Sequence, residues 1–179
     1  MAFGIAGAPE DLDPVDWIQG KKLLPRQNPV PLMLHGASGD TEQLADIGSG
    51  LFTVCSTRLR TVLTDSAVDN IDYFPVRLEH PESGRRRDDY LLVNILGLVK
   101  AVDVSNSTII PGRGNLPGKL RQFTIDERLA GNLALFRVAE SPRLIVIEGA
   151  IKAAIEAANL NGIYVQATQD WTGFNTGPI

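Results

Sequence analysis

The stretch from residue 52 to residue 76 places the strongest constraint on how this chain can fold. Its two ends are apolar, and Leu59, Val62 and Leu63 recur at helical spacing between them. Ser56 stands directly before this apolar series, where a hydroxyl oxygen can cap the first turn of a helix. The stretch therefore predicts a strand, a helix over about residues 57–65, and a second strand from residue 71.

The same pattern returns 92 positions further along the chain, where residues 146–168 carry apolar side chains at the matching places. Two of the matched pairs are identical, because Val54 meets Val146 and Ile71 meets Ile163. Two interpretations stay open, a duplicated structural unit and two unrelated units with a similar pattern. Under either one, a second helix is expected at about residues 149–159, and a strand at residues 163–168.

The composition is typical of a globular chain with a real core, since 44% of its 179 residues are hydrophobic and 21% are charged. The single cysteine, Cys55, excludes an internal disulfide and suits a reducing compartment. The first residues lack the basic start of a secretory signal, and no apolar run is long enough to span a bilayer. We therefore expect a cytoplasmic protein that makes no membrane contact.

These patterns together predict one α+β domain over residues 1–179. We expect a mixed or mostly antiparallel sheet with two main helices, at about residues 57–65 and 149–159. Residues 1–43 contain five prolines, so they are predicted to form an irregular N-terminal arm. Residues 44–168 would then form the core, and residues 169–179 a C-terminal tail.

The N-terminal part of the chain is acidic. Residues 1–50 contain seven acidic and three basic residues, whereas the remainder is balanced. This charge argues against nucleic-acid binding in that region. An acidic face can attract a basic protein partner, and the alternative is an ordinary solvated surface.

Three sequence features can be interpreted as sites of chemistry, and each also has a simpler structural explanation. Cys55 stands at a strand-to-helix junction that can favour a thiolate, but most free cysteines are buried apolar residues. The loop from His35 to Asp40 is rich in small residues but lacks the signature of a nucleotide-binding loop. The arginines at 85–87 precede two aspartates, which favours a self-neutralised hairpin tip over a nucleic-acid contact.

Several segments, in this order, make the chain similar to a bacterial family, the immunity proteins of polymorphic-toxin systems (the myxobacterial-type immunity domain, family eleven). The similarity covers roughly residues 44–168 and depends on the order of segments that are individually weak. The segments are Ser56 with Leu59 and Leu63, Phe74-Pro75-Val76, Tyr90-Leu91-Leu92-Val93-Asn94, Asp103 with Ser107, Leu135-Phe136-Arg137, and Asn161-Gly162-Ile163-Tyr164.

This resemblance implies a non-enzymatic protein that binds and neutralises a cognate toxin, with no catalytic residue, metal or cofactor. If the toxin surface is basic, the acidic residues of the arm are natural contacts. They are Glu10, Asp11, Asp13 and Asp16, with Trp17 as an anchor. The alternative is a small α/β enzyme or ligand-binding protein that uses Cys55 or the loop from His35 to Asp40.

Overall fold

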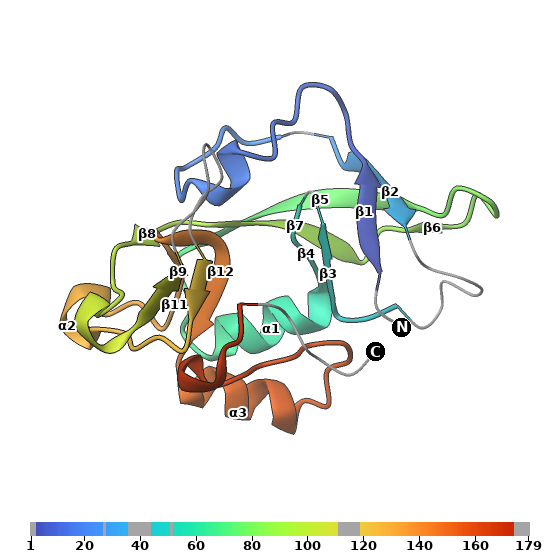
Figure 1. Cartoon of the computed structure of the whole chain (residues 1–179). Helices are drawn as coiled ribbons and strands as arrows, with labels where there is room; N and C mark the ends of the chain where they lie inside the picture. Colours follow the sequence, from blue (N-terminus) through green and yellow to red (C-terminus); the bar gives the residue numbers. More distant parts are fainter. Residues whose placement is uncertain (1–2, 27, 36–43, 51, 111–118, 174–179) are drawn as a thin grey trace.

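Six strands close into a barrel in the computed structural model, which describes residues 3–26, 28–35, 44–50, 52–110 and 119–173 (Figure 1). Around the barrel the strands follow the order β2-β1-β3-β4-β7-β5, and β5 pairs back onto β2. Their bounds are β1 Gly4–Gly7, β2 Val30–His35, β3 Ile47–Gly50, β4 Val54–Ser56, β5 Ile71–Glu79 and β7 Tyr90–Ile95. A short strand, β6 (Arg86–Arg87), extends β5 outside the ring.

The barrel mixes parallel and antiparallel pairs. The β1–β3 and β2–β5 pairs are parallel, and the other four are antiparallel. The β2–β5 pair closes the ring, with Leu32 opposite Leu78. Because closure satisfies the backbone groups of both outer strands, it removes the open sheet edges that would otherwise template aggregation.

Alternation along the strands places one set of side chains inside the barrel. In β5, Phe74, Val76 and Leu78 are buried, whereas Pro75 and Arg77 between them are exposed. Leu92 of β7 lies opposite Phe74 and is fully buried in the same cluster. This period of two is what a half-buried strand requires, since successive side chains point to opposite faces.

Two helices cover part of the outer face of the barrel (Figure 1). They are α1 (Thr57–Asp65) and α3 (Gly149–Ala157), which lie next to each other. Leu59 of α1 and Ile151 of α3 join one buried cluster with Cys55 and Val93, which are the outward residues of β4 and β7. Ser56 caps α1 by accepting a hydrogen bond from the backbone N–H of Leu59 at 3.1 Å, as its sequence position predicts.

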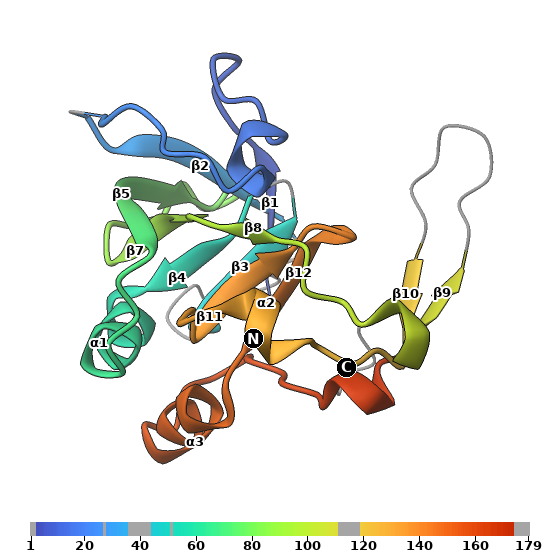
Figure 2. The ribbon, with the colours of Figure 1, turned by 90° about the vertical axis from the view of Figure 1, so that its left-hand side faces the viewer.

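The remaining elements form a second layer and a protruding hairpin (Figure 2). The strands β8, β11 and β12 make a three-stranded sheet over a third buried cluster, and β9 pairs with β10 in the hairpin.

None of the helices in the described ranges is long and apolar enough to cross a membrane. The bounds are η1 Asp16–Ile18, β8 Leu98–Val99, η3 Val104–Asn106, β9 Thr108–Ile110, β10 Lys119–Arg121, α2 Glu127–Ala130, β11 Leu135–Val138, β12 Ser141–Ile147 and η4 Thr168–Asp170.

The predicted fold class is wrong in two respects. The protein is mostly β, built on a closed barrel with additional sheets, whereas the sequence predicted an α+β fold in which two main helices accompany one mixed or mostly antiparallel sheet. The N-terminal arm is also not an appendage, because its residues supply β1 and β2 of the ring. The reason is that β1 has only four residues in a segment rich in turn formers, so local patterns indicated turns there. The apolar run Pro29–Leu34 indicated a short edge strand because it contains prolines, whereas β2 is paired on both sides.

The predicted second strand–helix–strand unit is only partly present. Its strand and helix exist as β12 and α3, close to the predicted positions. Residues 163–167, where the closing strand was expected, belong to no strand. Gly162 takes a φ of +71°, and a Cβ there would lie 2.3 Å from the Cβ of Ala45, so the chain turns against the segment before β3 and continues without forming a strand. The structural repeat is therefore limited to a strand followed by a helix.

Candidate functional site

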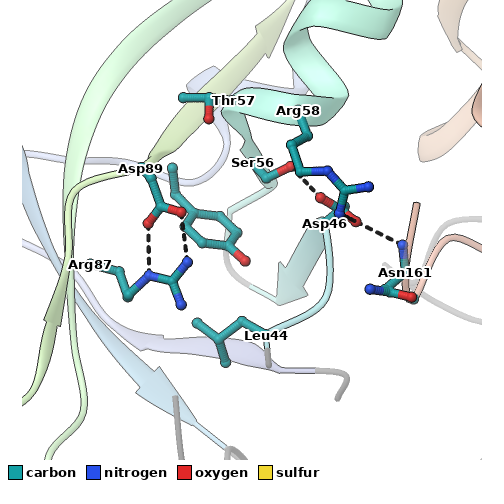
Figure 3. A pocket seen from close by; sticks show the side chains of 10 residues that line it. Leu44, Asp46, Ser56, Thr57, Arg58, Arg87, Asp89 and Asn161 are labelled. Carbon is teal, nitrogen blue, oxygen red and sulfur yellow. Dashed lines mark hydrogen bonds and ion pairs between the residues drawn. The ribbon is translucent and has the colours of Figure 1, made fainter. Parts of the chain in front are cut away.

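A polar pocket of about 470 Å³ lies where the start of α1 meets the chain before β3 (Figure 3). Ser56 and Arg58 come from the start of α1, and Asp89 and Tyr90 from the start of β7. Asn161 reaches the pocket from the segment after α3. The pocket therefore joins three parts of the chain that are distant in sequence.

Asp46 is the centre of this pocket. Its side chain is only 5% exposed, and Oδ1 accepts a hydrogen bond from Ser56 Oγ at 2.6 Å. Oδ2 accepts the backbone N–H of Asn161 at 2.7 Å and lies 3.4 Å from Nη1 of Arg58 (Figure 3). A buried carboxylate is tolerated only when its oxygens are satisfied in this way. Asp46 therefore fastens the segment after α3 to the barrel.

Arg58 extends the same connection to the end of α3. Its Nη2 donates to the carbonyl oxygens of Ala158 and Asn159 at 3.2 and 3.4 Å. These carbonyls follow the last turn of α3, where a positive charge is favourable and terminal acceptors need donors. Arg58 thus links the first turn of α1 to the C-terminal end of α3.

The opposite wall of the pocket holds an ion pair and a tyrosine. Arg87 and Asp89 approach to 2.6 Å, and the hydrogen bond from Arg87 holds the pKa of Asp89 below its ordinary value. The hydroxyl of Tyr90 donates to the carbonyl of Ala45 at 2.8 Å, and burial raises its pKa to about 12. Both groups are therefore committed to contacts within the chain at neutral pH.

The polar side chains of this pocket form hydrogen bonds within the protein and so stabilise the fold. The Ser56 hydroxyl donates a hydrogen bond to Asp46 and accepts one from the backbone N–H of Leu59. Both bonds serve the helix cap, so the hydroxyl is not positioned as a nucleophile. Within the described ranges, no group of three or more His, Cys, Asp and Glu side chains could hold a metal ion. Sequence reasoning missed Asp46, Arg58 and Asn161 as a unit, because no local pattern signals contacts between residues 46 and 161.

The cysteine favoured by the enzyme alternative is buried. Cys55 is 1% exposed under α1, and burial raises the pKa of its thiol to about 12. A thiol in this state is a packing residue, since the thiolate is the reactive form. The other feature of that alternative, the loop after His35, falls at residues 36–40, which lie outside the described residues.

The thiol of Cys55 is expected to react with a disulfide reagent at pH 8 at least about a thousandfold more slowly in the native protein than after unfolding, because its thiolate fraction is so small. Absorbance of the released thiol measures both rates, and the same sample in guanidinium chloride is the control. Labelling of the native protein at the unfolded rate would restore Cys55 as a candidate nucleophile.

The four acidic residues predicted to meet a partner lie together on an exposed loop before and within η1. Glu10, Asp13 and Asp16 are exposed, and Asp11 is exposed but pairs with Arg26 at 2.9 Å. Trp17 is different, because it is only 4% exposed. Its ring packs edge to face against those of two phenylalanines of the core, Phe52 at 6.0 Å and Phe74 at 5.1 Å. Trp17 therefore holds the loop on the core instead of presenting its ring to a partner.

Two apolar side chains on the same segment were missed by the sequence reasoning. Leu24 is 87% exposed and Val15 is 52% exposed. A partner that buried the exposed apolar area of these two side chains would gain stability for the complex. We use the name acidic loop below for residues 10–18, which contain four acidic residues and no basic one.

The arginine run is a self-neutralised hairpin, as the sequence predicted. Arg86 pairs with Glu79 at 2.9 Å, and Arg87 pairs with Asp89. Asp88 pairs with Arg77 at 3.2 Å. These contacts give the hairpin both signs of charge along β5 and β6.

Comparison with known families identifies the chain. The model of the immunity protein family (Imm11) matches residues 13–170, which includes the acidic loop from Asp13 onward, the barrel from β2 onward and both main helices. A search of curated proteins found no match. The family match confirms the resemblance found in the sequence and extends it toward the N-terminus. The chain therefore belongs to the Imm11 family of immunity proteins.

Proposed function

We propose that this protein binds a cognate toxin protein in the cytoplasm and neutralises it by occupying its surface, without catalysing a reaction. The observation that carries the proposal is the family match over residues 13–170. The contacts of the polar pocket support a binding role, because its serine, aspartate and tyrosine are engaged in holding the fold together. The burial of Cys55 also supports a role without covalent chemistry.

The acidic loop is the surface that we propose for toxin binding. Its exposed carboxylates at Glu10, Asp13 and Asp16 would steer a basic partner toward the protein. The exposed side chains of Val15 and Leu24 would then supply apolar area to be buried in the complex. Toxins that act on nucleic acid or phosphorylated substrates have basic sites, so a basic toxin surface is the occupant that this charge fits.

The direct test uses the protein encoded next to this chain in its genome. Expression of that neighbour alone should arrest growth, and co-expression with this chain should restore it. The two proteins should also elute together in size-exclusion chromatography. A neighbour that is toxic but is neither bound nor counteracted by this chain would contradict the proposed function.

Neutralising the acidic loop is expected to slow association with the toxin about tenfold at low salt, because steering depends on the net charge that faces the partner. The variant carries Glu10→Gln, Asp13→Asn and Asp16→Asn, and it retains Asp11 because that residue pairs with Arg26. Association rates measured by stopped flow at 20 mM and 300 mM salt should differ strongly for the wild type and little for the variant.

The control for this experiment changes the same net charge elsewhere. Asp65, Asp69 and Glu82 are also exposed, but they lie on α1 and on the loops before β5 and after it. Their neutralisation should leave the association rate within about twofold of the wild type. Equal slowing by both triple variants would remove the acidic loop from the interface and leave only an effect of total charge.

A further inference from the structure

The dipeptide Asn161-Gly162 occurs once in the chain, in the turn that follows α3. Both residues are exposed, and both line the polar pocket of about 470 Å³ beside Asp46. Water therefore reaches the side chain of Asn161 and the backbone of Gly162. The contacts that hold this segment use only the backbone of Asn161, so its side-chain amide has no part in fastening the fold.

Two groups that can react with each other are unengaged at this turn. Across the described ranges, neither the side-chain amide of Asn161 nor the backbone N–H of Gly162 forms a hydrogen bond. Figure 3 shows the backbone nitrogen of Asn161 joined to Asp46, while its side-chain amide has no marked bond to the residues drawn. The amide is therefore able to rotate toward the nitrogen of the next residue.

The fold requires a glycine at position 162, and the same glycine leaves the neighbouring nitrogen unhindered. Gly162 has a positive φ of +71°, and a Cβ there would lie 2.3 Å from the Cβ of Ala45. Any larger residue would strain this turn. Since glycine has no side chain, nothing on it shields its backbone nitrogen from Cγ of Asn161. The packing against Ala45 thus retains a dipeptide that is chemically labile.

We propose that Asn161 is a site of spontaneous deamidation. The backbone nitrogen of Gly162 gives up its proton and forms a bond to Cγ of Asn161. The side-chain nitrogen takes up a proton and leaves as ammonia, so the product is a five-membered cyclic imide. Water then breaks one of the two carbonyl–nitrogen bonds of the imide. One opening gives aspartate, and the other gives isoaspartate, in which the main chain passes through the side-chain carbon. Water is the only co-reactant.

This conversion acts directly on the contact between Asp46 and the segment after α3. The backbone N–H of Asn161 donates to Oδ2 of Asp46 at 2.7 Å, and its carbonyl accepts from the backbone N–H of Asp46 at 2.8 Å. An isoaspartate has one more main-chain atom between this N–H and this carbonyl, so both bonds cannot keep their geometry. An aspartate adds a negative charge beside the Asp46 carboxylate. The modified chain therefore holds this segment less firmly.

The same two hydrogen bonds restrain the reaction in the folded protein. Ring closure requires the nitrogen of Gly162 to approach Cγ, so the peptide unit after Asn161 must rotate. Asp46 opposes this rotation, because it binds the carbonyl and the N–H of Asn161. Conversion is therefore expected chiefly in molecules in which these bonds have opened locally.

The first test incubates the full folded chain at pH 8 and follows each asparagine by acidic proteolysis and mass spectrometry. Asn161 should convert to aspartate and isoaspartate at least about tenfold faster than Asn159, which is exposed in the same loop but precedes a leucine. The rate should rise with pH, since only the deprotonated nitrogen attacks. An Asn161 that stays intact, or that converts no faster than Asn159, would overturn the proposal.

Two variants test the mechanism and the restraint. Asn161→Gln keeps a side-chain amide and the backbone contacts, but its ring would have six members, so conversion at this position should stop. Asp46→Ala, checked by circular dichroism to be folded, should speed conversion of Asn161 about tenfold because the backbone N–H is released. Asp69→Ala, at an exposed site on the loop before β5, is the control and should leave the rate unchanged. Equal rates in both alanine variants would contradict the restraint by Asp46.

The second test measures the consequence of conversion. Hydrogen exchange of the Asp46 amide, which donates to the carbonyl of Asn161, should become at least about tenfold faster in the converted fraction of an aged sample. Asn161→Gln aged in the same way should keep the exchange rate of its fresh sample. Unchanged exchange in the converted wild type would show that the modification leaves the fastening intact, which contradicts its assigned effect. These measurements use the immunity protein alone, so their outcome is independent of the proposed function.

Discussion

Replacing Leu32 with alanine is expected to lower the free energy of unfolding by about 2–5 kcal/mol, the range found when a buried leucine is truncated. Leu32 is 1% exposed and lies opposite Leu78 in the β2–β5 pair that closes the barrel. The loss therefore combines removed apolar contacts with a cavity at the closure of the ring. For a chain of this size, each kcal/mol lowers the midpoint of thermal unfolding by about 2–4 °C.

The neighbouring residue supplies the control for this prediction. Met33 is 37% exposed and points to the outer face of the same strand, so Met33→Ala should cost less than about 1 kcal/mol. Urea unfolding followed by circular dichroism measures both variants. An equally small effect at both positions would mean that residues 30–35 form an appended arm, as the sequence suggested, and that β2 does not close the barrel.

Replacing Asp46 with alanine is expected to cost about 2–4 kcal/mol, because it removes the acceptor of two short hydrogen bonds inside a buried pocket. The Ser56 hydroxyl and the Asn161 backbone N–H would lose their acceptor, and Arg58 would lose its counter-charge. Asp46→Asn should have an intermediate effect, since the amide keeps one acceptor oxygen but loses the charge.

The expected loss at Asp46 has a local signature as well as a global one. Hydrogen exchange of the Asn161 amide should become faster in Asp46→Ala, because this N–H bonds to Oδ2. Asp69→Ala, at an exposed site on the loop before β5, is the control and should change stability by less than about 0.5 kcal/mol. Unchanged exchange at Asn161 would contradict the assigned role of Asp46.

Sequence patterns correctly predicted the elements whose capping and buried residues are neighbours in the chain. Helix α1 spans Thr57–Asp65 as expected, because its cap at Ser56 and its buried face at Leu59 and Leu63 lie within one stretch. Helix α2 is also determined by neighbouring residues, although its four residues are not part of the predicted fold, since Asp126 caps it and Gly131 ends it at a φ of +63°. In both helices the residues that decide the structure are neighbours in the chain.

The barrel could not be predicted by the same reasoning, because its closure depends on pairs that are far apart. Val30 of β2 lies opposite Val76 of β5, and Gly4 of β1 lies opposite Ser49 of β3. The strands β1 and β3 have four residues each, and so short a segment carries too little alternation to be recognised alone. Tertiary pairing, and not local preference, decided that prolines and glycines of residues 1–50 would lie in or beside strands.

The candidate sites show the same limit. The four acidic residues between positions 10 and 16 are close in sequence, and all of them are exposed on one loop. Their pattern in the sequence was therefore enough to predict a charged surface there. Trp17 looked like an anchor from its neighbours, but its burial depends on Phe52 and Phe74. The contact of Asp46 with Asn161 depends on the assembled fold, because the two residues are far apart in the sequence.

The parallel pairing of β2 with β5 also has a consequence for synthesis on the ribosome. The N-terminal strands leave the exit tunnel first, but β2 finds its second partner only when residues 76–79 have been made. Until then, its unpaired backbone and the side chains of Leu32 and Leu34 face solvent. The hydrogen bond from the Asn161 backbone N–H to Asp46 can form only after nearly all of the described residues have been synthesised. Under the proposed function, neutralisation of a toxin should therefore begin only after the segment that contains Asn161 has been translated.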